Sequence, residues 1–169
     1  MGENLGLGGQ RVMLEPRTFG KMLDALEIRN TDMVMDIGSG LGYSAAVIAH
    51  MAQVVVAVEE NSSMAEDALT LWSENASDNV VQHEGPLAEG AVEHGPYDVI
   101  VIEGGIEELP QTIADQLKDG GRIGCIFMEN ALGVVRVGHK IGGKLHWRYA
   151  FNGSAPVLSG FERKAAFAL

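Results

Sequence analysis

Three glycines at alternate positions form the most chemically informative stretch of the sequence. Gly38, Gly40 and Gly42 stand between an apolar strand pattern that contains Asp36 and a helical pattern that begins at Tyr43. In an open α/β sheet, ligands bind beyond the carboxyl ends of the strands, where such a strand-to-helix turn lies. Glycine suits this turn because a Cβ would obstruct both the tight bend and the close approach of a ligand. The stretch therefore predicts a ligand-binding loop from Asp36 to Gly42.

Acidic residues accompany this loop. Glu59 ends the second predicted strand, where a carboxylate accepts hydrogen bonds from the two hydroxyl groups of a nucleoside ribose. Glu60 follows it directly, and we place it in the same site. Asp36 closes an otherwise apolar strand, where an ionised group is costly without a partner. We expect that partner to be the amino group of a bound methionine moiety or the N–H groups of the loop itself.

The glycine spacing distinguishes between nucleotide cofactors. A dinucleotide fold uses Gly-x-Gly-x-x-Gly, whereas here the third glycine comes one position early and Tyr43 follows it. The sequence contains no Gly-Lys-Ser/Thr, which excludes a P-loop. A compact loop under the methionine part of S-adenosylmethionine fits better. The candidate cofactor-binding residues in these segments are Asp36, Gly38, Ser39, Gly40, Gly42, Tyr43, Glu59 and Glu60.

Short apolar runs alternate with helical patterns around these residues. Pro16 suits the first turn of a helix. A capping box at Ser63-Met64-Ala65-Glu66 predicts the start of another helix. Pro110 begins a third helix, which Gly120-Gly121 is expected to end. The predicted strands are Met33–Ile37, Val54–Val58, Val80–Gln82, Tyr97–Ile102 and Arg122–Phe127, and a helix over Tyr43–Met51 follows the first of them.

This alternation predicts a doubly wound α/β fold with a mostly parallel sheet covered on both faces. The glycine-rich residues 1–15 indicate an irregular lead-in. Over residues 132–169, Leu132–His139 and Lys144–Phe151 flank Gly142-Gly143, a hairpin signal, and Phe161–Phe167 is a candidate for one more strand. We expect one domain over residues 1–169, with a seven-stranded, Rossmann-like sheet and an antiparallel C-terminal edge.

Composition restricts the class of protein. The 169 residues carry a formal net charge of −11, which argues against a nucleic-acid partner. No apolar run approaches the ~20 residues that a membrane span needs, and the N-terminus lacks a signal-peptide pattern. Cys125 is the single cysteine, which fits a reducing compartment, so we expect a cytoplasmic protein without a membrane partner. The five histidines show no ligand spacing, and we expect no metal site.

The sequence resembles the protein-L-isoaspartate O-methyltransferase family over nearly the whole chain. The segment Asp36–Tyr43 resembles the family's first motif, which many methyltransferases share. Val58-Glu59 resembles its ribose-binding strand end. More particular are two later blocks at this distance from each other, Pro96-Tyr97-Asp98-Val99-Ile100 with Leu109-Pro110, and Gln116-Leu117-Lys118-Asp119-Gly120-Gly121-Arg122.

The resemblance implies methyl transfer from S-adenosylmethionine to the carboxylate of isoaspartyl residues in damaged proteins. The implied partner is a protein or peptide with isoaspartyl sites. The resemblance also places Gly85, Pro86 and Leu87 at the adenine and Leu14 beside the substrate; Arg17, one position after Pro16, is our own candidate to pair with the substrate carboxylate. A carboxylate is already ionised at neutral pH and needs no general base, so no catalytic residue is assigned.

Departures from the family pattern keep two alternatives open. Leu14 stands where the family has a serine that contacts the substrate. The family's Gly-Asp-Gly, whose acid holds the adenine amino group, reads Gly85-Pro86-Leu87 here, with Glu84 as a candidate substitute. The chain also looks short at its front, where family members usually carry a helical segment. The alternatives are a methyltransferase for a different acceptor and a non-catalytic cofactor-binding or interaction protein.

Overall fold

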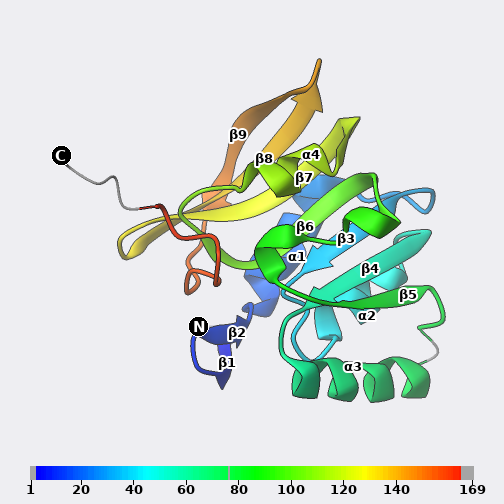
Figure 1. The fold of residues 1–169 in the computed structure, drawn as a ribbon. Helices are drawn as coiled ribbons and strands as arrows, with labels where there is room; N and C mark the ends of the chain where they lie inside the picture. The colour runs from blue at the N-terminus through cyan, green and yellow to red at the C-terminus, as the bar shows by residue number, and fades with distance from the viewer. Residues whose placement is uncertain (1–2, 76, 165–169) are drawn as a thin grey trace.

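The computed structural model describes residues 3–75 and 77–164, and its centre is a seven-stranded sheet in the order β5-β4-β3-β6-β7-β8-β9 (Figure 1). The first five strands in this order, β5, β4, β3, β6 and β7, are parallel to one another, and β8 and β9 continue the sheet antiparallel. The predicted fold class is therefore confirmed. The strands are β3 Met33–Ile37, β4 Val54–Glu59, β5 Val80–Glu84, β6 Tyr97–Ile106, β7 Leu117–Glu129, β8 Leu132–Ile141 and β9 Lys144–Asn152.

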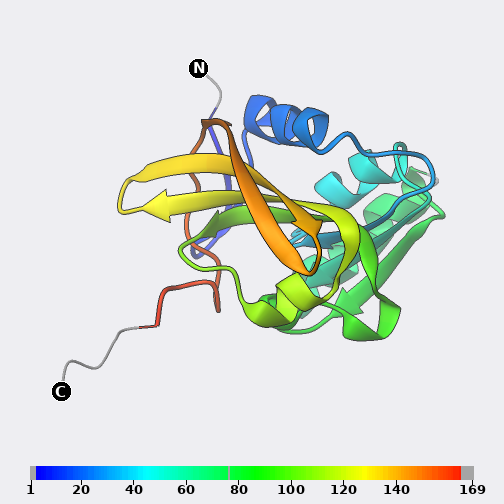
Figure 2. The same ribbon diagram turned by 90° about the horizontal axis from the view of Figure 1, so that it is seen from above.

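Helices cover both faces of this sheet. Figure 2 shows α1 on one face and α4 on the other. Within the described part of the chain, no helix is both long enough and apolar enough to cross a membrane. The α-helices are α1 Pro16–Leu26, α2 Tyr43–Ala49, α3 Ser62–Glu74 and α4 Gln111–Asp115, and the short 3-10 helices are η1 Leu87–Glu89 and η2 Val92–His94.

The two faces bury two separate hydrophobic clusters because side chains alternate along each strand. In β6, Val99 and Val101 pack with α1, α2 and α3, whereas Ile100 and Ile102 pack with η1 and α4. All four are fully buried. A strand that is buried on both faces reads as a continuous apolar run, which is why its position was visible in the sequence.

The expected irregular lead-in is wrong for residues 5–13. Strands β1 Leu5–Gly8 and β2 Arg11–Met13 form an antiparallel hairpin, separate from the main sheet (Figure 1). The glycine content hid it, because Gly8 ends β1 and Gly9 begins the turn, with φ of 106° and 57°, instead of interrupting a strand. The hairpin packs on the glycine loop. No local sequence pattern predicts this contact.

Three predicted element ends also need correction. Asn61, and not Ser63, caps α3: its side chain accepts a hydrogen bond of 3.1 Å from the Met64 N–H. Helix α4 ends at Asp115, and β7 then runs through Gly120-Gly121, which therefore does not terminate the helix. Residues 161–164 form no strand, and residues 165–169 of that predicted strand lie outside the described residues.

Trp72 fixes the end of the glycine loop. Gly42 caps the N-terminus of α2 with φ of 86°. The Trp72 indole on α3 donates a hydrogen bond of 2.9 Å to the Gly42 carbonyl. A Cβ at Gly42 would lie 2.7 Å from the Trp72 Nε1 and 2.8 Å from the Ala68 Cβ. Helix α3 thus holds the loop in place only because residue 42 has no side chain.

We expect Gly42→Ala to lower the free energy of unfolding by about 2–4 kcal/mol. The left-handed backbone costs alanine roughly 1–2 kcal/mol, and the collision with Trp72 adds an overpacking cost of similar size. Gly120→Ala is the matched control, because Gly120 has φ of 83° but nothing within 4 Å of its Cβ position. Chemical denaturation of both variants should give a loss of only about 1–2 kcal/mol for the control. Equal losses would contradict the role of Trp72.

Candidate functional site

The carboxyl ends of three parallel strands meet at the glycine loop. Ile37 in β3 pairs with Val58 in β4 and with Ile102 in β6, so the residues that follow each of them lie at one edge of the sheet. The first loop N–H groups anchor there: Gly38 N donates to the Val58 carbonyl at 2.9 Å. Gly38, Gly40 and Gly42 have φ of 81°, 55° and 86°, as the prediction of a glycine-dependent loop requires.

Glu59 lies at the centre of this edge, and the part of the chain that the structure describes already occupies both of its oxygens. Arg11 from the hairpin donates two parallel hydrogen bonds, Nη1 to Oε1 and Nη2 to Oε2, each of 2.8 Å. Gly40 N donates to Oε2 at 2.7 Å, and the N–H groups of Glu60 and Asn61 donate to Oε1 at 3.0 Å. The side chain is 1% exposed. Burial opposes ionisation, but the Arg11 guanidinium and these N–H groups hold the pKa of Glu59 below its ordinary value.

Arg11 was missed by sequence reasoning. It lies 48 residues from Glu59 in the chain, and no short-range motif joins positions so far apart. It also lies 3.8 Å from the exposed Glu60 carboxylate. The signal that could have flagged it is weak, a single cation in a glycine-rich and apolar lead-in.

The hairpin covers the loop. A Cβ at Gly40 would lie 2.8 Å from Leu7 Cδ1. Between the hairpin and the loop remains a cavity of about 20 Å³. That volume suits one water molecule, whereas small-molecule sites occupy roughly 300–1,000 Å³. A nucleoside cofactor at Glu59 therefore requires the hairpin to move. The cavity is lined by Leu7, Val12, Met13, Leu14, Phe19, Gly38, Ser39, Leu41, Tyr43, Ser44 and Glu103.

Two buried acids lie behind the hairpin. Asp36 is fully buried and accepts a hydrogen bond of 2.6 Å from the Ser44 hydroxyl at Oδ2. Its Oδ1, the Glu103 Oε1 and the Ser39 Oγ find no hydrogen-bond partner among residues 3–75 and 77–164. The expectation that loop N–H groups hold Asp36 is thus wrong, because those groups turn to Val58 and Glu59. The unpartnered oxygens can accept hydrogen bonds from a bound ligand.

Burial and repulsion from a neighbouring carboxylate, Glu59 for Asp36 and Asp36 for Glu103, oppose ionisation of the two acids. Burial raises the pKa of Asp36 to about 7, against the opposing effect of the Ser44 hydrogen bond. Burial and then the nearby Asp36 raise the pKa of Glu103 well above its ordinary value. An ammonium group bound between them would stabilise the ionised forms. Sequence reasoning missed Glu103, although the signal that marked Asp36 was available: an acid that closes an apolar strand pattern.

The chain is similar to known proteins of one family. Residues 2–146 match the family described as protein-L-isoaspartate(D-aspartate) O-methyltransferase. A protein-L-isoaspartate O-methyltransferase of Pelotomaculum thermopropionicum is 34% identical over 119 residues, which is 70% of this chain and 52% of that protein. One from Pelobacter propionicus is 33% identical over 139 residues, 79% of this chain and 62% of that protein. This chain belongs to the protein-L-isoaspartate(D-aspartate) O-methyltransferase family. It spans about half the length of several curated relatives that it matches.

Solved structures agree with the family assignment. A protein-L-isoaspartate O-methyltransferase superposes with a TM-score of 0.79 and 27% identity, over 86% of this chain and 48% of that one. A Plasmodium falciparum protein of the same description, solved with S-adenosyl-L-homocysteine, superposes with a TM-score of 0.78 at 18% identity, over 94% of this chain and 81% of that one. The second match shows the shared fold.

The residues expected at the adenine lie only partly near Glu59 and the glycine loop. Gly85 N donates a hydrogen bond of 3.0 Å to the Glu59 carbonyl, so this residue lies beside the strand end. Pro86 is exposed. Leu87 is fully buried in the hydrophobic cluster on the α4 face, and a ligand cannot reach its side chain there. The exposed Glu84 accepts a hydrogen bond from the Ser62 hydroxyl.

The expected substrate residues differ in burial. Leu14 is 3% exposed and lines the small cavity together with Phe19. Tyr43, 44% exposed, has its ring centroid 6.3 Å from that of Phe19. Arg17 is 78% exposed, and its Nε lies 4.0 Å from Glu15 Oε1. The two residues expected beside the substrate are therefore a buried apolar residue and a solvent-facing cation.

We expect the stability of the free protein to fall between about pH 5 and pH 8, and to fall less in Glu103→Gln. A carboxyl whose pKa is raised in the folded chain stabilises it below the unfolded pKa, and this contribution is lost as pH rises through the folded pKa. Each unit of the raised pKa corresponds to ~1.4 kcal/mol. Melting temperatures across this range should converge at low pH and separate by several degrees at high pH. Glu66→Gln, at an exposed helix position, is the control and should follow the wild type. Parallel curves for Glu103→Gln and wild type would contradict a raised pKa at Glu103.

Proposed function

We propose that this chain binds S-adenosylmethionine at the glycine loop and methylates the carboxylate of isoaspartyl residues in proteins. The observation that carries this proposal is Glu59 at the end of β4, directly hydrogen-bonded to Gly40 of the loop. A carboxylate in that position suits the two hydroxyl groups of a ribose. The family match supports the same cofactor and acceptor.

The donor and acceptor set fits the cofactor once the hairpin has moved. Glu59 would hold the ribose, and Asp36 with Glu103 would hold the ammonium group of the methionine part, for which their unpartnered oxygens are suited. The remaining proposed contacts come from the loop and its neighbours, namely Gly38, Ser39, Gly40, Gly42, Tyr43, Glu60, Gly85 and Pro86.

The cofactor supplies a methyl group on a positively charged sulfur. The residues of the chain position the cofactor and the acceptor and keep water away from them. The acceptor carboxylate is ionised at neutral pH, so no general base is needed. The apolar residues Val12, Met13 and Leu14 of the hairpin and its exit line the cavity and would keep bulk water away from a bound methyl donor. The net charge of −11 disfavours nucleic acid as substrate, and the buried thiol of Cys125 suits the cytoplasm.

A second candidate is a family member that does not turn over. The Arg11–Glu59 pair and the cavity of about 20 Å³ favour it, because both oppose cofactor entry. The buried Leu14 in place of a hydroxyl favours a third, a methyltransferase for another acceptor.

We expect Arg11→Met to bind S-adenosylmethionine at least about tenfold more tightly than wild type, which corresponds to ~1.4 kcal/mol. In the wild type the ribose must displace two charge-assisted hydrogen bonds from Glu59, and the variant removes this competition. Isothermal titration calorimetry measures the difference.

The double variant Arg11→Met/Glu59→Gln is the matched control for this measurement. It lacks both charges, so it leaves no unpaired buried ion, and it should lose the gain in affinity and fall below wild type. Circular dichroism establishes that both variants are folded. If the single and double variants bind equally, Glu59 does not hold the cofactor.

We expect methyl transfer to an isoaspartyl peptide and none to its normal aspartyl twin. The two acceptors are isomers that differ in which carboxyl group of the aspartate joins the backbone and which is free, so the pair tests acceptor geometry at constant composition. Mass spectrometry of both peptides after incubation with S-adenosylmethionine gives the result. Cofactor binding without transfer to either peptide would favour the non-catalytic candidate, and equal transfer to both would favour another acceptor.

A further inference from the structure

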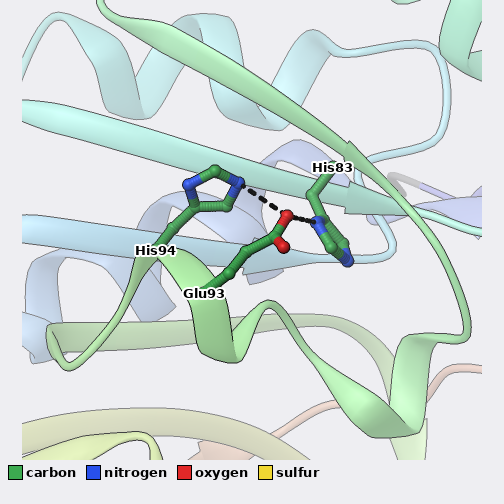
Figure 3. A group of neighbouring side chains, drawn as sticks. All are labelled: His83, Glu93 and His94. Atoms are coloured by element: carbon green, nitrogen blue, oxygen red, sulfur yellow. Dashed lines mark ion pairs between the residues drawn. The ribbon is translucent and has the colours of Figure 1, made fainter.

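Two histidines and one glutamate converge on the surface outside the glycine site. Figure 3 shows the Glu93 carboxylate between the imidazoles of His83 and His94. His83 Nδ1 lies 3.2 Å and His94 Nε2 lies 3.3 Å from the same oxygen, Glu93 Oε1. One ligand atom of each residue lies within 4.8 Å of the others. His83 belongs to β5, whereas the other two belong to η2.

These separations match those between ligands of a tetrahedral zinc ion. Zinc–nitrogen bonds of about 2.0–2.1 Å and zinc–oxygen bonds of about 2.0–2.2 Å at the tetrahedral angle place N and O about 3.3–3.5 Å apart. Two neutral imidazoles and a carboxylate also suit the borderline-soft Zn²⁺ better than Mg²⁺ or Ca²⁺, which prefer oxygen ligands alone. Both the geometry and the ligand chemistry therefore favour zinc.

The backbone that carries these side chains is firmly held. His83 lies in the sheet, paired with Val58 of β4. On the other side, the buried Tyr97 hydroxyl donates a hydrogen bond of 2.6 Å to the Ala91 carbonyl, and the Gln116 side chain accepts one of 3.0 Å from the Ala91 N–H. The two elements thus present their ligands at a fixed separation. Rigid placement lowers the entropy lost on metal binding.

The side chains themselves keep the freedom to complete a coordination sphere. The exposed fraction is 67% for Glu93, 33% for His94 and 23% for His83. The imidazole rings meet edge to face, with centroids 5.8 Å apart. Rotation of the exposed carboxylate can bring all three ligand atoms to one ion, and solvent can supply the fourth ligand.

We propose that His83, Glu93 and His94 bind one Zn²⁺, which links η2 to the end of β5. The ion would join the residues on either side of the segment from Gly85 to Leu87. Gly85 itself lies close to this cluster, because a Cβ there would be 3.2 Å from His83 Nε2. This site is structural, at the edge of the proposed cofactor site, and does not depend on methyl transfer. The sequence led us to expect no metal site, because the ligands come from two elements and form no spacing motif.

The test is titration of the metal-free full chain with ZnCl₂ by calorimetry and with CoCl₂ by visible absorption. We expect one equivalent of metal to bind, with the absorption of tetrahedral Co²⁺. His83→Ala/His94→Ala should abolish binding. Glu93→Gln should weaken it at least about tenfold, ~1.4 kcal/mol, because a carboxamide oxygen is a much weaker zinc ligand. Glu93 is mostly exposed, so this variant keeps the test sharp if the double variant fails to fold.

His139→Ala/His146→Ala is the matched control. These residues pair across β8 and β9 and form the other neighbouring histidine pair. This variant should bind Zn²⁺ as the wild type does. Absence of stoichiometric binding in the wild type would overturn the proposal, and so would binding that the control abolishes or that Glu93→Gln leaves unchanged.

Discussion

Glu59 joins four segments of the chain at one point, three through its buried carboxylate and one through its backbone carbonyl. It binds Arg11 of the hairpin, Gly40 of the loop, and the N–H of Asn61 that leads into α3, while the Glu59 carbonyl binds Gly85. A buried ion without partners costs several kcal/mol, so each segment is held where its donor reaches an oxygen. The edge of the sheet, the loop and the hairpin therefore depend on one another.

The charges at this edge of the sheet explain why the hairpin closes over the glycine loop. Asp36, Glu59 and Glu103 gather at the ends of neighbouring strands, and Arg11 is a cation held directly against Glu59. A cationic cofactor would bring its own positive charge to the same acids. Under the proposed function, hairpin and cofactor thus compete for the same electrostatic role, and opening of the hairpin is coupled to binding.

The apolar residues of the hairpin that lie over the glycine loop also have two opposing effects on the proposed reaction. Leu7 lies against Gly40. Val12, Met13 and Leu14 line the cavity beside it, together with Phe19. These contacts bury apolar surface, which stabilises the closed hairpin. The same surface would keep water away from a bound methyl donor. The hairpin therefore helps the proposed chemistry only if it can open without loss of the rest of the fold.

The sequence alone determined the sheet, the glycine loop and the acid at the end of β4. Each of these depends on local signals: largely apolar runs such as the predicted strand Tyr97–Ile102, and glycines where the backbone turns left-handed. Glu59 was found because strand ends are recognisable and parallel strands end at one edge. The proposed role of Asp36 came from the same pattern; of its two expected partners, the loop N–H groups were wrong because the Ser44 hydroxyl binds instead, and the methionine amino group stays a proposal.

Only the tertiary structure decided what those residues contact. The Arg11–Glu59 pair, the Trp72 hydrogen bond to Gly42 and the cluster of His83 with Glu93 and His94 join residues from separate elements. Such contacts are chosen by packing and by the need of buried polar groups for partners, and these depend on three-dimensional distances that spacing in the chain does not encode.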